Sequence, residues 1–198
     1  DTARAIQYLR HNADSLNIDK KRVAVYGGSA GAGASLWMAF NDDLADPEHP
    51  DPVLRESTRV VAAGGNVPQA TYDFPQWPTF LELPPWLWEM SSGMVCPLYY
   101  HFEKEEVDSE KGRQMRRDLD MLAMIDASDP PVWLRCERDN TPSETWDHML
   151  HHPGHVVKLA EVCREKGVPV TVILKDTPSE ERIDVLDFLF EALLRDND

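Results

Sequence analysis

Residues 22–33 read Arg-Val-Ala-Val-Tyr-Gly-Gly-Ser-Ala-Gly-Ala-Gly, a short β-type run followed by small residues. The β-branched and aromatic run at 22–26 predicts a short buried strand, and the small residues from Ser29 onward predict a helix packed close to a sheet. Between them lies Gly-x-Ser-x-Gly. In a strand-turn-helix context this pattern holds a serine hydroxyl on a strained turn above the sheet. Ser29 is therefore a candidate nucleophile.

The residues around Ser29 fit the same interpretation. We expect a side chain at Gly27 or Gly31 to collide with neighbouring backbone, which would account for both glycines. Gly28 and Ala30 complete the turn, and the Ala30 N–H, at the start of the helix, points to where an oxyanion would form. A phosphate-binding turn or simple tight packing is the alternative. Neither a Gly-x-Gly-x-x-Gly fingerprint nor a Gly-Lys-Ser/Thr loop is present, so the nucleophile turn is favoured.

Strand and helix patterns alternate on either side of this turn. Strands are predicted at 22–26, 59–65, 132–136 and 168–174, and helices at 1–16, 29–40 and 114–124, with a further helix ending at Gly167. Thr-Pro-Ser-Glu, at 141–144 and again at 177–180, has the form of a helix start. The final helix is marked by an apolar stripe of Ile183, Leu186, Phe190 and Leu193. This alternation predicts an α/β fold with a mainly parallel sheet, helices on both faces, and reactive groups at the carboxyl ends of the strands.

Residues 66–112 follow no regular period and alternate prolines and aromatic residues with acidic turns. A structureless insertion of this length is uncommon in a compact domain. We expect either a functional lid or cap, or a satellite hydrophobic cluster packed under a long loop.

The stretch RVAVYGGSAGAGASLWMAF, residues 22–40, resembles the nucleophile segment of α/β-hydrolase esterases of the carboxylesterase and hormone-sensitive-lipase-like group. The usual family motif is Gly-x-Ser-Ala-Gly-Gly, and Ala32 stands here in place of its last glycine. The resemblance implies a carboxylic ester hydrolase that acts on a small-molecule ester by serine acyl transfer. It also implies that the four strands are the fifth to eighth of an eight-stranded sheet. We expect residues 1–198 to be a partial α/β-hydrolase domain, the C-terminal part of a longer protein whose N-terminal half lies upstream. No cofactor and no metal site are expected.

The resemblance places the acid of a catalytic triad after the next-to-last strand. Asp139 stands three residues after the strand at 132–136, and Glu137 is its nearby rival. The alternative for Asp139 is an ordinary turn aspartate ahead of a capped helix. The family's histidine belongs in the loop after the last strand, but that loop, 175–181, has none.

Without an imidazole, a serine hydroxyl has no base with a pKa near neutrality. Three accounts remain open. The base could come from the cluster His-Met-Leu-His-His-Pro-Gly-His at 148–155, with His151 and His152 the best candidates. The protein could instead be a catalytically degenerate relative that keeps a pocket for binding. Finally, the i, i+4 histidine pairs could hold a metal, but Pro153-Gly154 interrupts the helix that would align them. A serine peptidase of the prolyl-oligopeptidase type shares the nucleophile turn and gains nothing from this sequence, because it too needs a histidine after the last strand.

The composition of the chain limits the kinds of partner and substrate that it can bind. The chain has 198 residues, 35 Asp and Glu against 20 Lys and Arg, and a net charge of −15, which argues against nucleic acid or an anionic membrane surface. No apolar run is long enough to span a membrane. The three cysteines are widely spaced, so we expect buried thiols and not a disulfide framework. The aromatic content of residues 66–112 favours an apolar or aromatic ester over a charged substrate.

Overall fold

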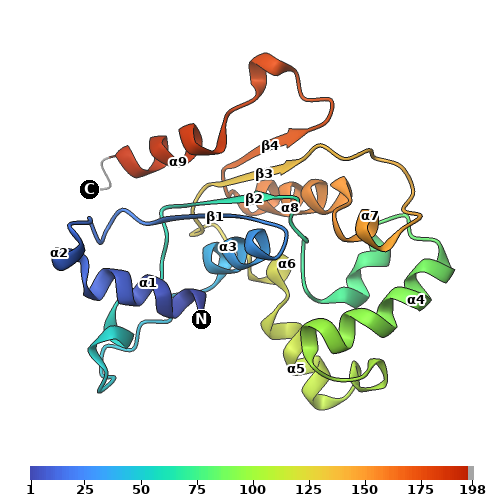
Figure 1. The fold of residues 1–198 in the computed structure, drawn as a ribbon, viewed down its shortest axis with the longest axis horizontal. Helices are drawn as coiled ribbons and strands as arrows, with labels where there is room; N and C mark the ends of the chain where they lie inside the picture. The colour runs from blue at the N-terminus through green and yellow to red at the C-terminus, as the bar shows by residue number, and fades with distance from the viewer. Residues whose placement is uncertain (196–198) are drawn as a thin grey trace.

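The computed structural model describes residues 1–195 and is organised around a parallel sheet of four strands (Figure 1). The strands are β1 Ala24–Gly28, β2 Ala62–Asn66, β3 Val132–Cys136 and β4 Val170–Leu174, and they lie side by side in chain order. Tyr26 pairs with Gly64 across β1 and β2, and Trp133 pairs with Thr171 across β3 and β4. The predicted parallel α/β architecture is confirmed, with β1 and β4 at the two edges of the described sheet.

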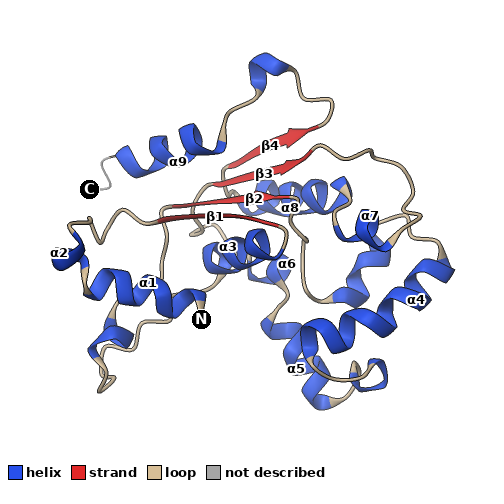
Figure 2. Cartoon of the chain, in the orientation of Figure 1, coloured by secondary structure: helices blue, strands red, loops and turns tan. Residues whose placement is uncertain are grey.

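Helices connect the strands and cover both faces of the sheet (Figure 2). The α-helices are α1 Thr2–His11, α2 Ala13–Leu16, α3 Ala30–Phe40, α4 Pro85–Val95, α5 Glu110–Asp118, α6 Met121–Met124, α7 Trp146–Leu150, α8 Pro153–Lys166 and α9 Val185–Leu194. Shorter 3-10 turns are η1 Pro52–Arg55, η2 Phe74–Thr79, η4 Lys104–Glu106 and η5 Ser179–Glu181, and η3 Cys96–Tyr100 is a π-helical turn. The two helices predicted at 1–16 and 114–124 are each broken in two, at Asn12 and at residues 119–120. None of the helices within residues 1–195 has the length and apolar character needed to cross a membrane.

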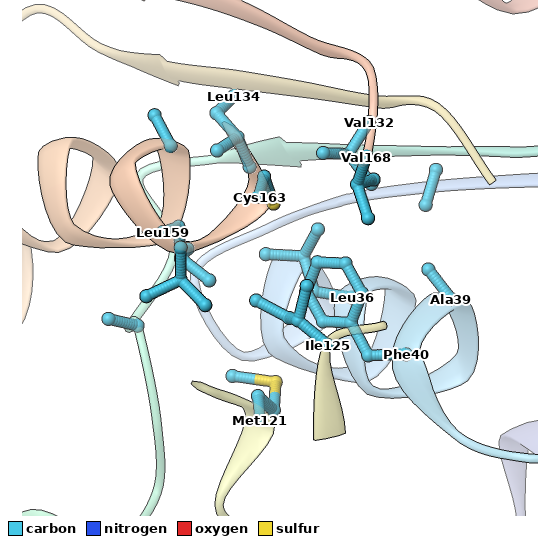
Figure 3. Close-up of a cluster of buried hydrophobic side chains, with 14 of the residues drawn as sticks. Leu36, Ala39, Phe40, Met121, Ile125, Val132, Leu134, Leu159, Cys163 and Val168 are labelled. Carbon is cyan, nitrogen blue, oxygen red and sulfur yellow. The ribbon is translucent and has the colours of Figure 1, made fainter. Parts of the chain in front are cut away.

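The main core lies between the sheet and the helices α3, α6 and α8 (Figure 3). Leu36 of α3, Leu134 of β3 and Leu159 of α8 are fully buried in it. On the opposite face α9 packs Val185, Leu189 and Ala192 against the sheet in a second, smaller cluster. Cys96, Cys136 and Cys163 are buried free thiols, as predicted.

A third cluster accounts for the segment 66–112. Its buried members are Phe74, Trp77, Leu81, Leu87, Val95, Cys96, Tyr100, Phe102 and Met149. All of these except Met149 come from that segment, and Met149 comes from α7. The segment is thus folded around its own aromatic core, and this core also holds one face of α7 beyond the carboxyl ends of the strands (Figure 1).

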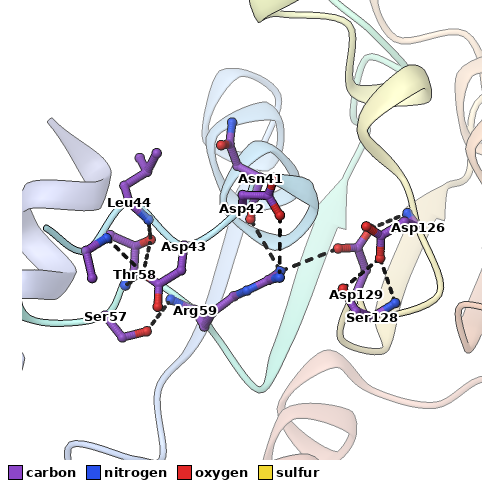
Figure 4. Close-up of polar contacts among 11 residues, drawn as sticks. Asn41, Asp42, Asp43, Leu44, Ser57, Thr58, Arg59, Asp126, Ser128 and Asp129 are labelled. Atoms are coloured by element: carbon purple, nitrogen blue, oxygen red, sulfur yellow. Dashed lines mark hydrogen bonds and ion pairs between the residues drawn. The ribbon is translucent and has the colours of Figure 1, made fainter. Parts of the chain in front are cut away.

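Arg59 ties the acidic loop after α3 to the turn before β3 (Figure 4). Its guanidinium lies 3.7 Å from Asp42 Oδ1 and 3.7 Å from Asp129 Oδ1. Asp43, next in the loop, accepts hydrogen bonds from the backbone N–H and the hydroxyl of Thr58. Arg59 and Thr58 are therefore partners of these two loop carboxylates.

Both predicted helix starts at Thr-Pro-Ser-Glu are wrong. Helix α7 begins at Trp146, with Thr145 as its N-cap, and α9 begins at Val185, with Asp184 as its N-cap. The Thr177 hydroxyl instead accepts the N–H of Leu174 at 2.8 Å and closes the end of β4, so its capping capacity serves a turn.

The predicted apolar stripe of α9 is also on the wrong face. Ile183, Leu186 and Phe190 are exposed, and the helix buries the face marked by Val185, Leu189 and Ala192. Both faces of this helix are apolar, so helical spacing alone could not choose between them.

Candidate active site

Ser29 stands on the turn that joins β1 to α3. Its φ of 51° and ψ of −118° are uncommon for a residue with a side chain, and its N–H donates to Asn66 O at 2.9 Å. A Cβ on Gly27 would lie 2.3 Å from the carbonyl carbon of Gly31, so the backbone at 27 requires glycine. A Cβ on Gly31 meets nothing within 4 Å. The expected collision is therefore found at Gly27 and is absent at Gly31, because β1 packs against the backbone of the first helical turn and Gly31 faces open space.

The Ser29 hydroxyl faces an imidazole. Ser29 Oγ lies 2.8 Å from His151 Nε2, and on the other side of the ring His151 Nδ1 lies 3.1 Å from both Oδ1 and the carbonyl oxygen of Asp147. Two acceptors at Nδ1 assign the ring proton to that nitrogen, which leaves Nε2 free to accept from the serine hydroxyl. The His151 side chain is only 14% exposed, whereas that of Asp147 is 64% exposed.

Asp147 is shared between two partners. Arg138 Nη1 lies 2.5 Å from its second carboxylate oxygen, Oδ2. The hydrogen bond from Arg138, with a smaller contribution from His151, holds the pKa of the Asp147 carboxyl below its usual value. The carboxylate thus stays ionised beside the imidazole over a wide pH range.

The other predicted base, His152, serves as the N-cap of α8. Its Nδ1 accepts the N–H of Gly154 at 2.9 Å as the N-cap of α8, and its Nε2–H donates to Thr141 O at 3.0 Å. With both ring nitrogens occupied, His152 does not face Ser29. Burial lowers its pKa, in agreement with a neutral capping ring.

The structure does not bring the predicted acid, Asp139, to His151. Its carboxylate forms an ion pair with Lys175, which lowers its pKa, and its carbonyl oxygen accepts from His148 Nε2 at 2.9 Å. Lys175 begins the loop after β4, where the family resemblance would place a histidine. Glu137, the rival, is bonded to Arg135 and Arg182.

Asp147 was missed by reasoning from the sequence. The signal that could have found it is its spacing, since it precedes His151 by four residues and such residues meet on one helical face. The family resemblance places the acid at the end of a strand, and Asp147 lies in a helix instead.

An apolar cavity borders the turn. It has a volume of about 450 Å³, and its lining includes Ala30, Ala34, Trp37, Tyr72 and Leu119. Ala30 is in the first turn of α3, where backbone N–H groups have no partner within the helix. A Cβ on Gly33 would lie 1.8 Å from the Tyr72 hydroxyl oxygen, so the glycine at 33 is what admits Tyr72 to this wall. Within residues 1–195, no group of three or more His, Cys, Asp or Glu side chains is arranged to hold a metal ion.

Comparison with known proteins supports the fold of this chain. The BD-FAE family model matches residues 1–61. An acetyl ester-xyloside bifunctional hydrolase from Caldicellulosiruptor lactoaceticus superposes with a TM-score of 0.63 at 19% identity, covering 97% of this chain and 62% of its own. A truncated carbohydrate esterase from gut microbiota gives 0.60 at 17% identity, covering 98% and 67%. A thermophilic esterase from the Planctomycetes species Thermogutta terrifontis gives 0.54 at 18% identity, covering 98% and 59%.

The chain therefore spans about three fifths to two thirds of the length of these structures. None of the curated proteins matches the sequence.

Proposed function

Since this chain has the α/β-hydrolase fold of the esterases it resembles, we propose that it is a carboxylic ester hydrolase acting by acyl transfer through Ser29. The observation that carries the proposal is the 2.8 Å separation of Ser29 Oγ and His151 Nε2, which puts an imidazole within hydrogen-bond reach of the hydroxyl. Ser29 is the nucleophile, His151 the general base, and Asp147, in place of Asp139, the carboxylate that orients the base.

In the acylation step, Ser29 Oγ attacks the carbonyl carbon of the ester while its proton passes to His151 Nε2. The carbonyl oxygen becomes an oxyanion, and the Ala30 N–H, aided by the positive end of α3, stabilises it. The intermediate then collapses, the bond to the alcohol breaks, and His151 returns the proton to the departing oxygen.

In the deacylation step, water replaces the alcohol. His151 takes a proton from the water as it attacks the acyl group on Ser29, and it returns that proton to Ser29 Oγ when the acid leaves. Through both steps Asp147 accepts the Nδ1–H and offsets the positive charge that develops on the ring. Because Arg138 occupies its other oxygen, Asp147 stabilises this charge less than an unshared carboxylate would.

The cavity beside Ala30 favours an uncharged ester. Its lining is mostly aliphatic and aromatic, with Asp1 and Thr2 as further members, and the chain carries a net charge of −15, which repels anionic substrates. The matched structures include enzymes described as an acetyl ester hydrolase and a carbohydrate esterase, so esters with a short acyl group are the first substrates to test.

A fluorophosphonate probe tests the proposal directly in the complete natural polypeptide. We expect labelling that is lost in Ser29→Ala and His151→Ala, and hydrolysis of p-nitrophenyl acetate that falls at least ~10³-fold in either variant. Absence of labelling in the parent protein would overturn the proposal and favour the degenerate binding protein. Labelling together with cleavage of peptides in preference to esters would favour a serine peptidase.

A further inference from the structure

The residues that lead into His151 are held by a row of buried hydrogen bonds. The carbonyl oxygens of Met149, Leu150 and His151, three in succession, each accept from a different buried side chain. His155 Nε2 lies 3.1 Å from Met149 O, Gln69 Nε2 lies 2.7 Å from Leu150 O, and Cys136 Sγ lies 3.2 Å from His151 O. We call Gln69, Cys136 and His155 the carbonyl cradle.

The three donors come from separate parts of the fold. Cys136 is the last residue of β3, Gln69 follows β2, and His155 lies in the first turns of α8. All three are at most 1% exposed. A central strand, the segment that follows another central strand, and a helix therefore all bond to the same short piece of backbone.

His155 is itself fixed on all sides. Its Nδ1 accepts the N–H of Ala70 at 3.2 Å, which assigns the ring proton to Nε2 and makes that nitrogen the donor to Met149. Its ring packs edge-to-face against Trp77 and Phe80, with ring centroids 4.7 and 5.6 Å apart. The aromatic segment 66–112 thereby reaches the cradle.

Helix α7 needs such support, because a helix of five residues is not stable on its own. It carries Asp147, and His151 is its C-cap, so any drift of α7 moves acid and base together. A misplacement of about 1 Å can cost on the order of 10²-fold in rate. The last carbonyl groups of a helix lack partners within it, and the cradle supplies them here.

We propose that Gln69, Cys136 and His155 are positioning residues that lock the carbonyl groups of residues 149–151 and so hold the His151 imidazole against Ser29. This inference rests on the proposed function. Among the described residues, Cys136 and His155 form no hydrogen bond to Ser29 or to the His151 ring, and the further bond of Gln69 is at its Oε1, which accepts from the Tyr72 hydroxyl at 3.3 Å. Their effect on the His151 imidazole therefore passes through the backbone of residues 149–151.

The chain offers a matched control for two of the donors. Gln7 is also a buried glutamine that donates to two carbonyl oxygens, those of Leu54 in η1 and of Glu56, its C-cap, neither of which belongs to the cradle. Cys163 is a fully buried thiol in the main core, like Cys136. Gln69→Met is therefore compared with Gln7→Met, and Cys136→Ala with Cys163→Ala, in the complete natural polypeptide.

Each variant is tested for ester turnover, fluorophosphonate labelling of Ser29, thermal stability, and the ¹⁵N NMR shifts of the His151 ring, which report where its proton lies. We expect Gln69→Met and Cys136→Ala to lower kcat about tenfold and to alter the His151 ring shifts. KM should stay nearly unchanged in Cys136→Ala, whereas Gln69→Met also removes the acceptor of the Tyr72 hydroxyl in the cavity wall, so its KM is not used as a criterion. The controls should lose comparable stability without either change. Cys136→Ser, which keeps a donor, should recover most of the lost kcat.

The inference is overturned if the cradle variants and their controls lose activity only in proportion to lost stability and leave the His151 shifts unchanged. It is separable from the proposed function. If the parent protein is not labelled at Ser29, the proposed function fails, and the NMR comparison alone decides whether the cradle positions His151.

Discussion

His151 Nδ1 lies 3.1 Å from Oδ1 of Asp147, the residue four positions before it. The proposed acid and base thus come from one short segment, α7 and its C-cap, and not from the ends of two separate strands. The positions that the family resemblance assigns to the acid and the base are held here by Asp139 and Lys175, which form an ion pair with each other.

Replacing Asp147 and Asp139 one at a time tests which of the two carboxylates orients His151. Asp147→Asn should lower kcat by about 10²-fold, since a carboxylate that orients the base supplies up to ~10⁴ in a well-buried triad and Asp147 is exposed and shared with Arg138. Asp139→Asn, its matched control, should change kcat less than about threefold, because that carboxylate faces Lys175. The measurement is steady-state ester hydrolysis at pH 8. A larger loss in Asp139→Asn than in Asp147→Asn would reverse the assignment.

His151 and His152 should also differ in what their replacement does to the protein. His152 caps α8 through its Nδ1, so His152→Ala should cost about 1 kcal/mol of stability, and His152→Asn, which can cap, should cost less. Neither variant should abolish labelling of Ser29, whereas His151→Ala should abolish it. Urea denaturation and fluorophosphonate labelling measure the two effects. Loss of labelling in His152→Asn at unchanged stability would contradict this division of roles.

The glycines of the turn should respond unequally to alanine. Gly27→Ala pushes a Cβ to 2.3 Å from the backbone of Gly31 and should destabilise the protein by roughly 2–3 kcal/mol or prevent folding. Gly31→Ala meets open space at the start of α3 and should be neutral or stabilising by up to about 1 kcal/mol. Thermal denaturation of the two variants provides the comparison. Equal destabilisation would show that the first helical turn is crowded after all.

His155 should make stability depend on pH. Burial lowers its pKa from 6.5 to about 3, against the partly opposing hydrogen bond to Met149 and with small contributions from the nearby His152 and His151. Below about pH 6.5 the His155 ring therefore binds a proton in the unfolded chain but stays neutral in the folded chain. The free energy of unfolding falls as the pH drops from there toward 3, by at most roughly 1.4 kcal/mol per pH unit.

The variant His155→Gln isolates this effect from that of other titrating groups. It should be less stable than the parent at pH 7, and the difference should shrink as the pH falls to about 4, because glutamine carries no titrating ring. Urea denaturation at several pH values tests this. A difference that stays constant with pH would show that the His155 ring is not held neutral.

Features of the fold that depend on residues close together in the chain could be predicted from the sequence. The strand at 24–28, the serine turn and the small-residue helix follow one another within about fifteen residues, and their identity depends on β propensity and on glycine's lack of a Cβ. The parallel sheet followed from the alternation of such units. The helix start predicted at Thr177 failed because its hydroxyl accepts the N–H of Leu174 in a turn that the sequence does not mark, and the helix after Thr141 begins only at Trp146, with Thr145 as its N-cap.

By itself, the sequence determined the sheet, the position of Ser29 at the end of β1, and the short list of histidines that could serve it. Only the tertiary structure decided which histidine reaches Ser29, which carboxylate stands behind it, and which face of α9 is buried. These choices depend on contacts between residues far apart in the chain, such as the 122 positions that separate Ser29 from His151. The hydrogen bond between Ser29 and His151 depends on how the chain packs around α7. The aromatic core holds Met149, and the buried donors Gln69, Cys136 and His155 bond to the backbone next to it. Such contacts cannot be predicted from a local sequence pattern.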